Sequence, residues 1–180
     1  MPTEQQSVFR PTVALFILLS LLMWSAPAGQ ARPASGARAA ARDVLKTSGV
    51  QGGLVVHVEC GNGRLTAALQ ASDTYLVQGL DRDSGDVKKA RDYVSSQDTY
   101  GPVSIDHWNG KKLPYADNLV NLLVVDRGAE ISQDEMMRVL APRGVACIRD
   151  GNGWTKTGKP WPSQIDDCPH YPPGPAHNPV

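Results

Sequence analysis

The sequence lacks an excess of charge of either sign. Lys plus Arg and Asp plus Glu number 18 each, so the formal net charge is zero, and no basic run carries interleaved aromatic residues. Binding to nucleic acid depends on a positive field that attracts the phosphate backbone. The composition therefore predicts no nucleic-acid partner.

Cysteine and histidine are also scarce. The three cysteines and four histidines show no spacing typical of a zinc site, so we predict no metal site. In an exported chain an odd number of cysteines leaves at least one thiol unpaired. We expect Cys60 and Cys147 to lie on strands about 10 Å apart with another strand between them, which exceeds the roughly 7 Å Cα limit for a disulfide. Both are predicted to be small buried apolar residues, and Cys168 belongs to the C-terminal tail.

No apolar run reaches the roughly 18 residues that a membrane-spanning helix needs. The longest, residues 13–24, follows Arg10 and precedes the small-x-small site Ala26-Pro27-Ala28. This order is typical of a secretory signal peptide over residues 1–28, cleaved after Ala28 or, at a second site, after Ala31. We therefore expect an exported protein, periplasmic or secreted, that meets a membrane only through this segment. The alternative is an uncleaved N-terminal membrane anchor.

Between residues 35 and 150, short runs rich in β-branched residues alternate with segments of helical periodicity. The expected strands are 54–58, 74–80, 103–108, 119–125 and 145–148, and the expected helices are 35–46, 65–70, 83–93 and 133–140. Ser132 and Glu135 form a capping box at the start of the last helix. The alternation predicts one α/β domain over 35–150, a Rossmann-like three-layer sandwich of five mainly parallel strands with helices on both faces. Residues 151–180 are Pro-rich, and we expect an irregular tail or a truncated linker there.

The segment 54–69 carries the most specific motif. An apolar run ends at Glu59, two glycines one residue apart follow at Gly61 and Gly63, and a helix-forming segment starts at Leu65. Such a strand–turn–helix unit holds a nucleotide-like ligand at the carboxyl edge of a parallel sheet. Thr66 stands at the third position of a G-x-G-x-x-G fingerprint, and the G-K-[ST] of a P-loop is missing. Neither a dinucleotide fingerprint nor a P-loop is therefore complete.

Two acidic residues narrow the class of ligand. Glu59 lies beside the glycine turn, where a carboxylate suits a ligand that carries a cation. Asp81 closes the next expected strand about twenty residues later, a spacing suited to binding ribose hydroxyls. Plainer alternatives remain open: an ordinary strand-to-helix turn for the two glycines, a helix cap for Asp81, and a common turn pair for Asn109-Gly110.

These motifs resemble those of the class I S-adenosylmethionine-dependent methyltransferases. The similar segments are the acidic glycine-rich motif 59–63, the ribose-binding acid Asp81, the adenine-contacting stretch 109–117 and the turn 138–144 before the last strand. Over roughly residues 36–150, the resemblance implies S-adenosyl-L-methionine as a small-molecule cofactor. It implies that Glu59 binds the methionine amino group, that Gly61 and Gly63 let the cofactor lie against the backbone, that Asp81 binds the ribose, and that Asn109 and Gly110 face the adenine.

The sequence departs from this family at its C-terminal end. Arg143 stands where the family usually has glycine. No clear apolar strand follows Ile148, so we expect the C-terminal hairpin of the full methyltransferase fold to be missing. Residues 154–171 resemble the junction in exported bacterial proteins between such a domain and a β-propeller of the pyrroloquinoline-quinone type, although this chain contains no propeller repeat.

Two hypotheses of function follow. The first is methyl transfer from S-adenosyl-L-methionine to an unknown small acceptor. The second is a non-catalytic, degenerate domain that serves an exported protein as a binding or interaction module, with a β-propeller as its partner domain. Export favours the second, because S-adenosylmethionine is made in the cytoplasm. No catalytic residue is assigned: Asp126 is the candidate acid or base but is expected only to line the pocket, and His57 is expected to be a buried strand residue.

The signal-peptide interpretation predicts the N-terminus of the exported protein. N-terminal sequencing should start at Gly29, after cleavage behind Ala28, or at Arg32, after cleavage behind Ala31. An intact Met1 on membrane-bound protein would support the anchor instead.

Overall fold

The computed structural model describes residues 33–163 except 98, 100, 127–128 and 152. The predicted signal peptide with both cleavage sites, Cys168 and most of the Pro-rich tail lie outside the described residues and stay predictions. Within the described ranges, every helix is too short or too polar to cross a membrane.

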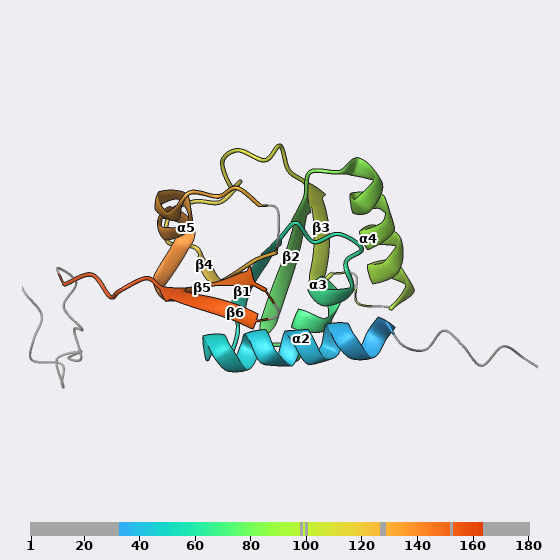
Figure 1. Ribbon diagram of the computed structural model, residues 1–180, viewed down its shortest axis with the longest axis horizontal. Helices are drawn as coiled ribbons and strands as arrows, with labels where there is room; N and C mark the ends of the chain where they lie inside the picture. The colour runs from blue at the N-terminus through green and yellow to red at the C-terminus, as the bar shows by residue number, and fades with distance from the viewer. Residues whose placement is uncertain (1–32, 98, 100, 127–128, 152, 164–180) are drawn as a thin grey trace, which may run out of the picture. The chain divides into compact units, whose positions relative to one another are not determined.

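The described chain forms a single sheet flanked by helices (Figure 1). The elements in chain order are α2 (Pro33–Ser48), β1 (Gly53–Val58), α3 (Arg64–Leu69), β2 (Tyr75–Asp81), α4 (Ser84–Ser96), β3 (Val103–His107), β4 (Val120–Val125), α5 (Gln133–Val139), β5 (Leu140–Asp150) and β6 (Gly153–Gly158). The strand order is β3-β2-β1-β4-β5-β6, in which β1 to β5 run parallel and β6 runs antiparallel to β5. The predicted Rossmann-like three-layer sandwich is confirmed, with one strand more than expected.

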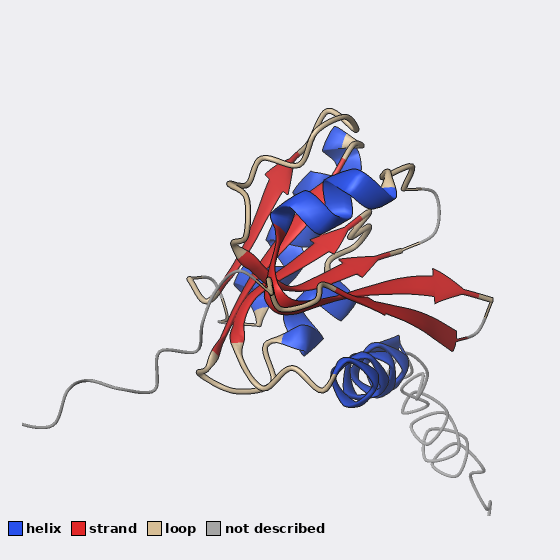
Figure 2. Cartoon of the chain, turned by 90° about the vertical axis from the view of Figure 1, so that its left-hand side faces the viewer, coloured by secondary structure: helices blue, strands red, loops and turns tan. Residues whose placement is uncertain are grey.

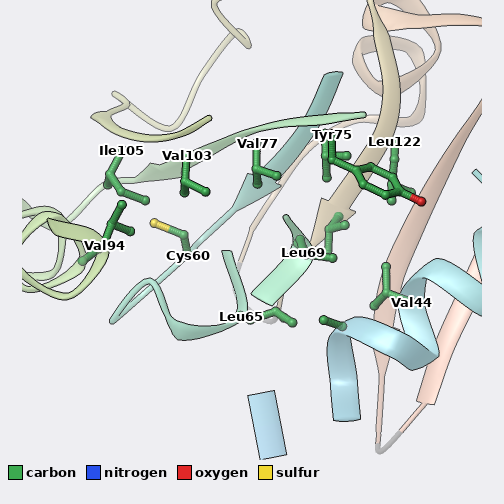
Figure 3. Close-up of a cluster of buried hydrophobic side chains, with 14 of the residues drawn as sticks. Val44, Cys60, Leu65, Leu69, Tyr75, Val77, Val94, Val103, Ile105 and Leu122 are labelled. Atoms are coloured by element: carbon green, nitrogen blue, oxygen red, sulfur yellow. The ribbon is translucent and has the colours of Figure 1, made fainter. Parts of the chain in front are cut away.

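Two hydrophobic cores lie on the two faces of this sheet, and helices cover both (Figure 2). Val55 and Val56 are adjacent in β1 and belong to opposite cores, because successive side chains of a strand point to opposite faces. Figure 3 shows the first core, in which Val44 of α2, Leu69 of α3 and Val94 of α4 lie on one face of the sheet. The second core takes its helical residues from α5. The apolar run of β4 is buried on both faces, as its sequence predicted.

A loop, and not a helix, connects β3 to β4 through residues 108–119. Its buried residues Trp108 and Leu113 pack into the second core. Trp108 Nε1 donates to the carbonyl of Lys112 at 2.9 Å, and the Leu113 N–H donates to Glu135 Oε1 of α5 at 2.7 Å. These contacts hold the loop, which carries Asn109 and Gly110, against α5.

As expected, no clear apolar strand follows Ile148, but a polar strand does. Residues 153–158, expected to belong to an irregular tail, form β6, and the register pairs Arg149 with Trp154 and Val145 with Gly158. β6 is an edge strand whose residues are exposed or only half-buried, so it carries no apolar run that could be recognised in the sequence. Lys156 Nζ also donates to the carbonyl of Ser48 at 2.9 Å and so ties the strand to α2. The chain therefore has an antiparallel hairpin at this edge of the sheet.

Strand β5 also begins earlier than predicted, at Leu140 in place of Val145. The first part contains Pro142, which cannot donate a backbone hydrogen bond. The register between β4 and β5 shifts between Val120 and Leu122, and this irregularity accommodates the proline. One half of the predicted capping box is confirmed, because the Ser132 hydroxyl accepts from the Glu135 N–H at 3.2 Å, whereas the Glu135 carboxylate accepts from the Leu113 N–H and Arg138.

The packing of Gly63 predicts a large effect of a single methyl group. Gly63 has φ 72°, and a Cβ there would lie 2.9 Å from the Cα of Ala90 in α4. Gly63→Ala should lower the free energy of unfolding by about 2–4 kcal/mol, through left-handed strain and overpacking together. Gly36→Ala is the matched control, because no atom lies within 4 Å of its Cβ position, and it should be neutral or slightly stabilising. Equal effects of the two changes in denaturant unfolding would contradict the tight packing of Gly63 on α4.

Candidate functional site

The loop after β1 turns sharply at the carboxyl edge of the sheet. Glu59, Gly61 and Gly63 all have left-handed φ angles, of 57°, 53° and 72°. A glutamate in this conformation is uncommon and costs about 1–3 kcal/mol, so the surrounding contacts must hold it. The Cys60 N–H donates to the Leu80 carbonyl at 3.1 Å and the Gly63 N–H to the Cys60 carbonyl at 3.0 Å. The loop is thus fixed to the end of β2 before α3 begins.

The two glycines of the loop have different structural roles. At Gly61 no atom lies within 4 Å of a Cβ position, so its backbone is open to a ligand. At Gly63 that position is filled by Ala90, and Gly63 lines neither of the pockets at this loop. Glycine at 63 is therefore required for packing of the loop on α4. At Gly61 there is room for a cofactor to approach the backbone, as predicted from the sequence.

Asp81 connects the glycine loop to the start of α4. Asp81 is only 4% exposed. Oδ2 accepts from the Gly61 N–H at 2.7 Å, and Oδ1 accepts from the Asp83 N–H at 2.9 Å. The helix cap is Asp83, whose carboxylate accepts from the Asp86 N–H at 2.9 Å, so the alternative of Asp81 as the cap does not hold. Asp81 is instead the group that positions Gly61.

Glu59 forms an ion pair that the sequence pattern did not predict. Arg82 Nε donates to Glu59 Oε1 at 2.5 Å, and the glutamate side chain is 17% exposed. The stem of Arg82 lies against Gly110, because a Cβ at Gly110 would be 2.6 Å from Arg82 Cδ. Arg82 thus brings together two residues predicted to bind opposite ends of one ligand. Glu59 follows β1 and Arg82 follows the neighbouring strand β2. This placement of opposite charges was the signal in the sequence that could have predicted the pair.

Two pockets flank the loop and share Glu59 and Gly61 as lining residues. The first, here called the acidic pocket, has a volume of about 530 Å³ and is lined by Glu59, Gly61, Asp81, Arg82, Asp83 and Asp86. The second, here called the His57 pocket, has a volume of about 440 Å³ and runs from the loop to the ends of β4 and β5. Four carboxylates and one guanidinium line the acidic pocket, so its field favours a cationic ligand. Volumes of this size suit a small molecule.

The His57 pocket has a polar wall built from three strands. His57 of β1 is 1% exposed, as expected for a buried strand residue, and its Nδ1 lies 2.9 Å from Thr66 Oγ1. Asp126, after β4, lies in this wall and lines the pocket as predicted. Arg149 Nε donates to Asp126 Oδ1 at 2.6 Å, and the Arg149 guanidinium lies 4.2 Å from the centre of the Trp154 ring. Within the described residues no group of three potential ligands could hold a metal ion.

Asn109 and Gly110 form a turn after β3. Asn109 Oδ1 accepts from the Lys111 N–H at 3.1 Å, which is a local turn bond, and Gly110 has φ 79°. Neither residue lines the acidic pocket or the His57 pocket. The turn is therefore established, and the predicted contacts with adenine stay a prediction.

Arg143 lies away from both pockets. It has φ 65°, the conformation in which glycine would be unstrained, and its N–H donates to the Lys159 carbonyl at 3.0 Å. Its guanidinium lies 4.6 Å from the centre of the Trp161 ring. Arg143 belongs to the first half of β5, whereas the polar wall of the His57 pocket contains Arg149 near the end of that strand. The departure from the glycine pattern at this position therefore does not touch the site.

Comparison with known proteins identifies the fold. The sequence matches no family model and no curated protein. A protein of Methanococcus maripaludis, provisionally assigned as an S-adenosyl-L-methionine-dependent methyltransferase, is similar over 85% of this chain and 69% of its own, with a TM-score of 0.60 and 19% identity. A geranyl diphosphate C-methyltransferase from Streptomyces coelicolor, crystallised with S-adenosyl-L-homocysteine, is similar over 61% of this chain and 44% of its own, with a TM-score of 0.55 and 15% identity.

A third similar structure is that of an enzyme with a different reaction. It is a [4+2]-cyclase, similar over 63% of this chain and 46% of its own, with a TM-score of 0.55 and 21% identity. This chain thus spans less than half the length of the last two structures. At such identities the likeness establishes the methyltransferase fold, and a fold alone does not fix the reaction.

The burial of two cysteines predicts their reactivity. Burial, with a smaller effect of nearby Asp81, raises the pKa of the Cys60 thiol to about 12, and burial raises the pKa of Cys147 to about 11. Both thiols are unpaired and stay protonated at pH 8, and the thiolate is the reactive form. In a Cys168→Ser variant, iodoacetamide at pH 8 should label neither cysteine in the folded protein and both in guanidinium chloride. Rapid labelling of folded protein, read by mass spectrometry, would contradict the buried positions.

Proposed function

We propose that this chain binds S-adenosyl-L-methionine across the glycine loop and transfers its methyl group to a small acceptor. The observation that carries the proposal is the open Gly61 backbone held by Asp81 at the edge of an acidic pocket. A cationic sulfonium ligand suits this field. The fold supports the proposal, because several of the similar solved structures are S-adenosylmethionine-dependent methyltransferases.

The chain's residues have separate parts in this proposal. Asp81 binds the ribose, since each of its oxygens accepts one backbone hydrogen bond and retains a lone pair for a hydroxyl. Glu59 binds the amino group while it stays next to Arg82, and Gly61 gives the backbone contact. Asn109 and Gly110 face the adenine. The bound cofactor supplies an electrophilic methyl group, and the protein aligns the acceptor with it and limits water in the site.

The second candidate is a non-catalytic binding or interaction module. The observation in its favour is the ion pair between Glu59 and Arg82, which occupies one of the carboxylates proposed to bind the cofactor. The similar [4+2]-cyclase adds that this fold is compatible with other chemistry. Against the second candidate stands the position of Arg143 away from the pockets, because a changed glycine at the site is what a degenerate domain would show.

The export of this chain and its relation to a β-propeller belong to the same proposal. We infer from the predicted signal peptide that the domain works outside the cytoplasm, in the periplasm or as a secreted protein. Its partner domain would be a β-propeller, as the similarity of residues 154–171 to a junction segment implies. The cofactor and the acceptor must then bind the protein either before its export or afterwards, outside the cytoplasm.

Calorimetry tests cofactor binding directly. We expect the protein to bind S-adenosylmethionine and S-adenosylhomocysteine, with the sulfonium form favoured and its affinity falling as salt rises, because the acidic pocket attracts the cation. Absence of heat at high cofactor concentration would exclude both methyl transfer and cofactor binding.

A variant pair separates the ribose contact from a general effect of charge. Asp81→Ala should weaken binding by about 1–3 kcal/mol, the usual cost of losing a charged hydrogen-bonding partner. Asp106→Ala is the matched control, because Asp106 is exposed on β3, pairs with Arg91 and lines neither pocket. Circular dichroism first checks that both variants are folded. An unchanged affinity of folded Asp81→Ala would refute the ribose assignment.

A further inference from the structure

His57 carries an unsatisfied polar atom. Among the described residues, its Nε2 is the buried side-chain nitrogen that has no hydrogen-bond partner. Leaving such an atom unpaired costs about 1–3 kcal/mol, and native structures keep few of them. The plain interpretation of His57 as a strand residue explains its burial but not this orphan atom.

The ring of His57 is fixed from its other side. Thr66 is fully buried, and its Oγ1 lies 2.9 Å from Nδ1. This contact orients Nε2 toward Asp126, whose Oδ2 is 3.9 Å away, too far for a hydrogen bond. A modest shift of the Asp126 carboxylate would close this distance, and such contacts are often long in a ligand-free protein.

Asp126 lies between the buried ring and the pocket. Its side chain is 28% exposed and lines the His57 pocket, while Arg149 holds its other oxygen. The other charged group that lines this pocket is Glu59, which pairs with Arg82. Gly36, Ala37 and Ala40 of α2 also line this pocket, so part of its wall consists of small residues.

We propose that Asp126 and His57 together accept the proton of a hydroxyl or amine group on the methyl acceptor, with Asp126 in contact with the acceptor and His57 behind it, where its Nε2 receives the proton from Asp126. The inference rests on the proposed function, since it places the acceptor in the His57 pocket. It deepens that function by naming the chemical class of the acceptor.

The proton transfer accompanies methyl transfer as follows. The acceptor oxygen or nitrogen attacks the methyl carbon with a lone pair, and the carbon–sulfur bond breaks with its electron pair passing to sulfur. The proton of the acceptor's O–H or N–H group moves to Asp126 and then to Nε2 of His57.

The proposal requires one tautomer of the ring. Neutral His57 must carry its proton on Nδ1, where it donates to Thr66 Oγ1, and must leave Nε2 bare to accept a proton. Nitrogen-15 NMR of the full chain reads the tautomer, and the spectrum of His57→Gln assigns the signals. We expect an unprotonated Nε2 in the free protein and in the presence of S-adenosylhomocysteine. A proton on Nε2 in neutral His57 would overturn the inference.

Methyl transfer to simple probes is the second test. With labelled S-adenosylmethionine, ethanolamine offers both a hydroxyl and an amine as acceptor. Asp126→Asn and His57→Gln should each lower the transfer rate about 100-fold or more and flatten its dependence on pH, the usual effects of losing a proton acceptor. Asp106→Asn, outside the pocket, should keep the wild-type rate. Equal rates in wild type and in both pocket variants would overturn the inference.

Two controls separate the possible failures. Glutamine retains a polar atom near the position of Nε2 but cannot accept the proton, so a folded His57→Gln tests chemistry and not packing. Asp126→Asn changes a partly exposed side chain and serves if His57→Gln does not fold. The tautomer is read without cofactor, so a wrong tautomer refutes this inference alone, whereas absence of cofactor binding in calorimetry refutes the proposed function.

Discussion

The hydrogen bond from the Gly61 N–H to the Asp81 carboxylate is the contact on which the candidate site depends. It joins the loop after β1 to the end of β2, and the other oxygen of Asp81 holds the backbone that enters α4. Because the loop contains a glutamate with a left-handed φ, an outside contact is needed to keep its shape. Both pockets are lined by Glu59 and Gly61, so their shapes depend on that loop.

The electrostatics of the site are uneven around this loop. On the side of Asp81 four carboxylates face one guanidinium, whereas on the side of His57 the Asp126 carboxylate is paired with Arg149. A cation is therefore favoured in the acidic pocket, whereas the His57 pocket is lined by two carboxylates, Glu59 and Asp126, and the guanidinium of Arg149. This division is consistent with a sulfonium donor and a hydroxyl or amine acceptor that meet where the pockets share residues.

Two features that point to a degenerate domain in the sequence have structural explanations. The edge strand β6 pairs with β5 through its backbone and needs few apolar side chains, so a polar sequence after Ile148 does not exclude a further strand. Arg143 occupies a position that suits glycine, but it packs on Trp161 in the first half of β5 and not at the pockets. The expected export of the chain is therefore the main argument left against methyl transfer, together with the Glu59–Arg82 pair.

The sequence by itself determined the alternation of strands and helices, the buried centre of the sheet and the positions of Glu59, Gly61 and Asp81 at strand ends. These features depend on local patterns, such as apolar periodicity, caps and turn residues, that are visible along the chain. Tertiary structure alone decided which groups meet. Arg82 reaches Glu59 from the next strand, Ala90 of α4 fills the space beside Gly63, and Asp126 comes within 3.9 Å of His57 from a neighbouring strand. Such contacts join residues distant in sequence, and the register and spacing of parallel strands, which the sequence does not display, bring them together.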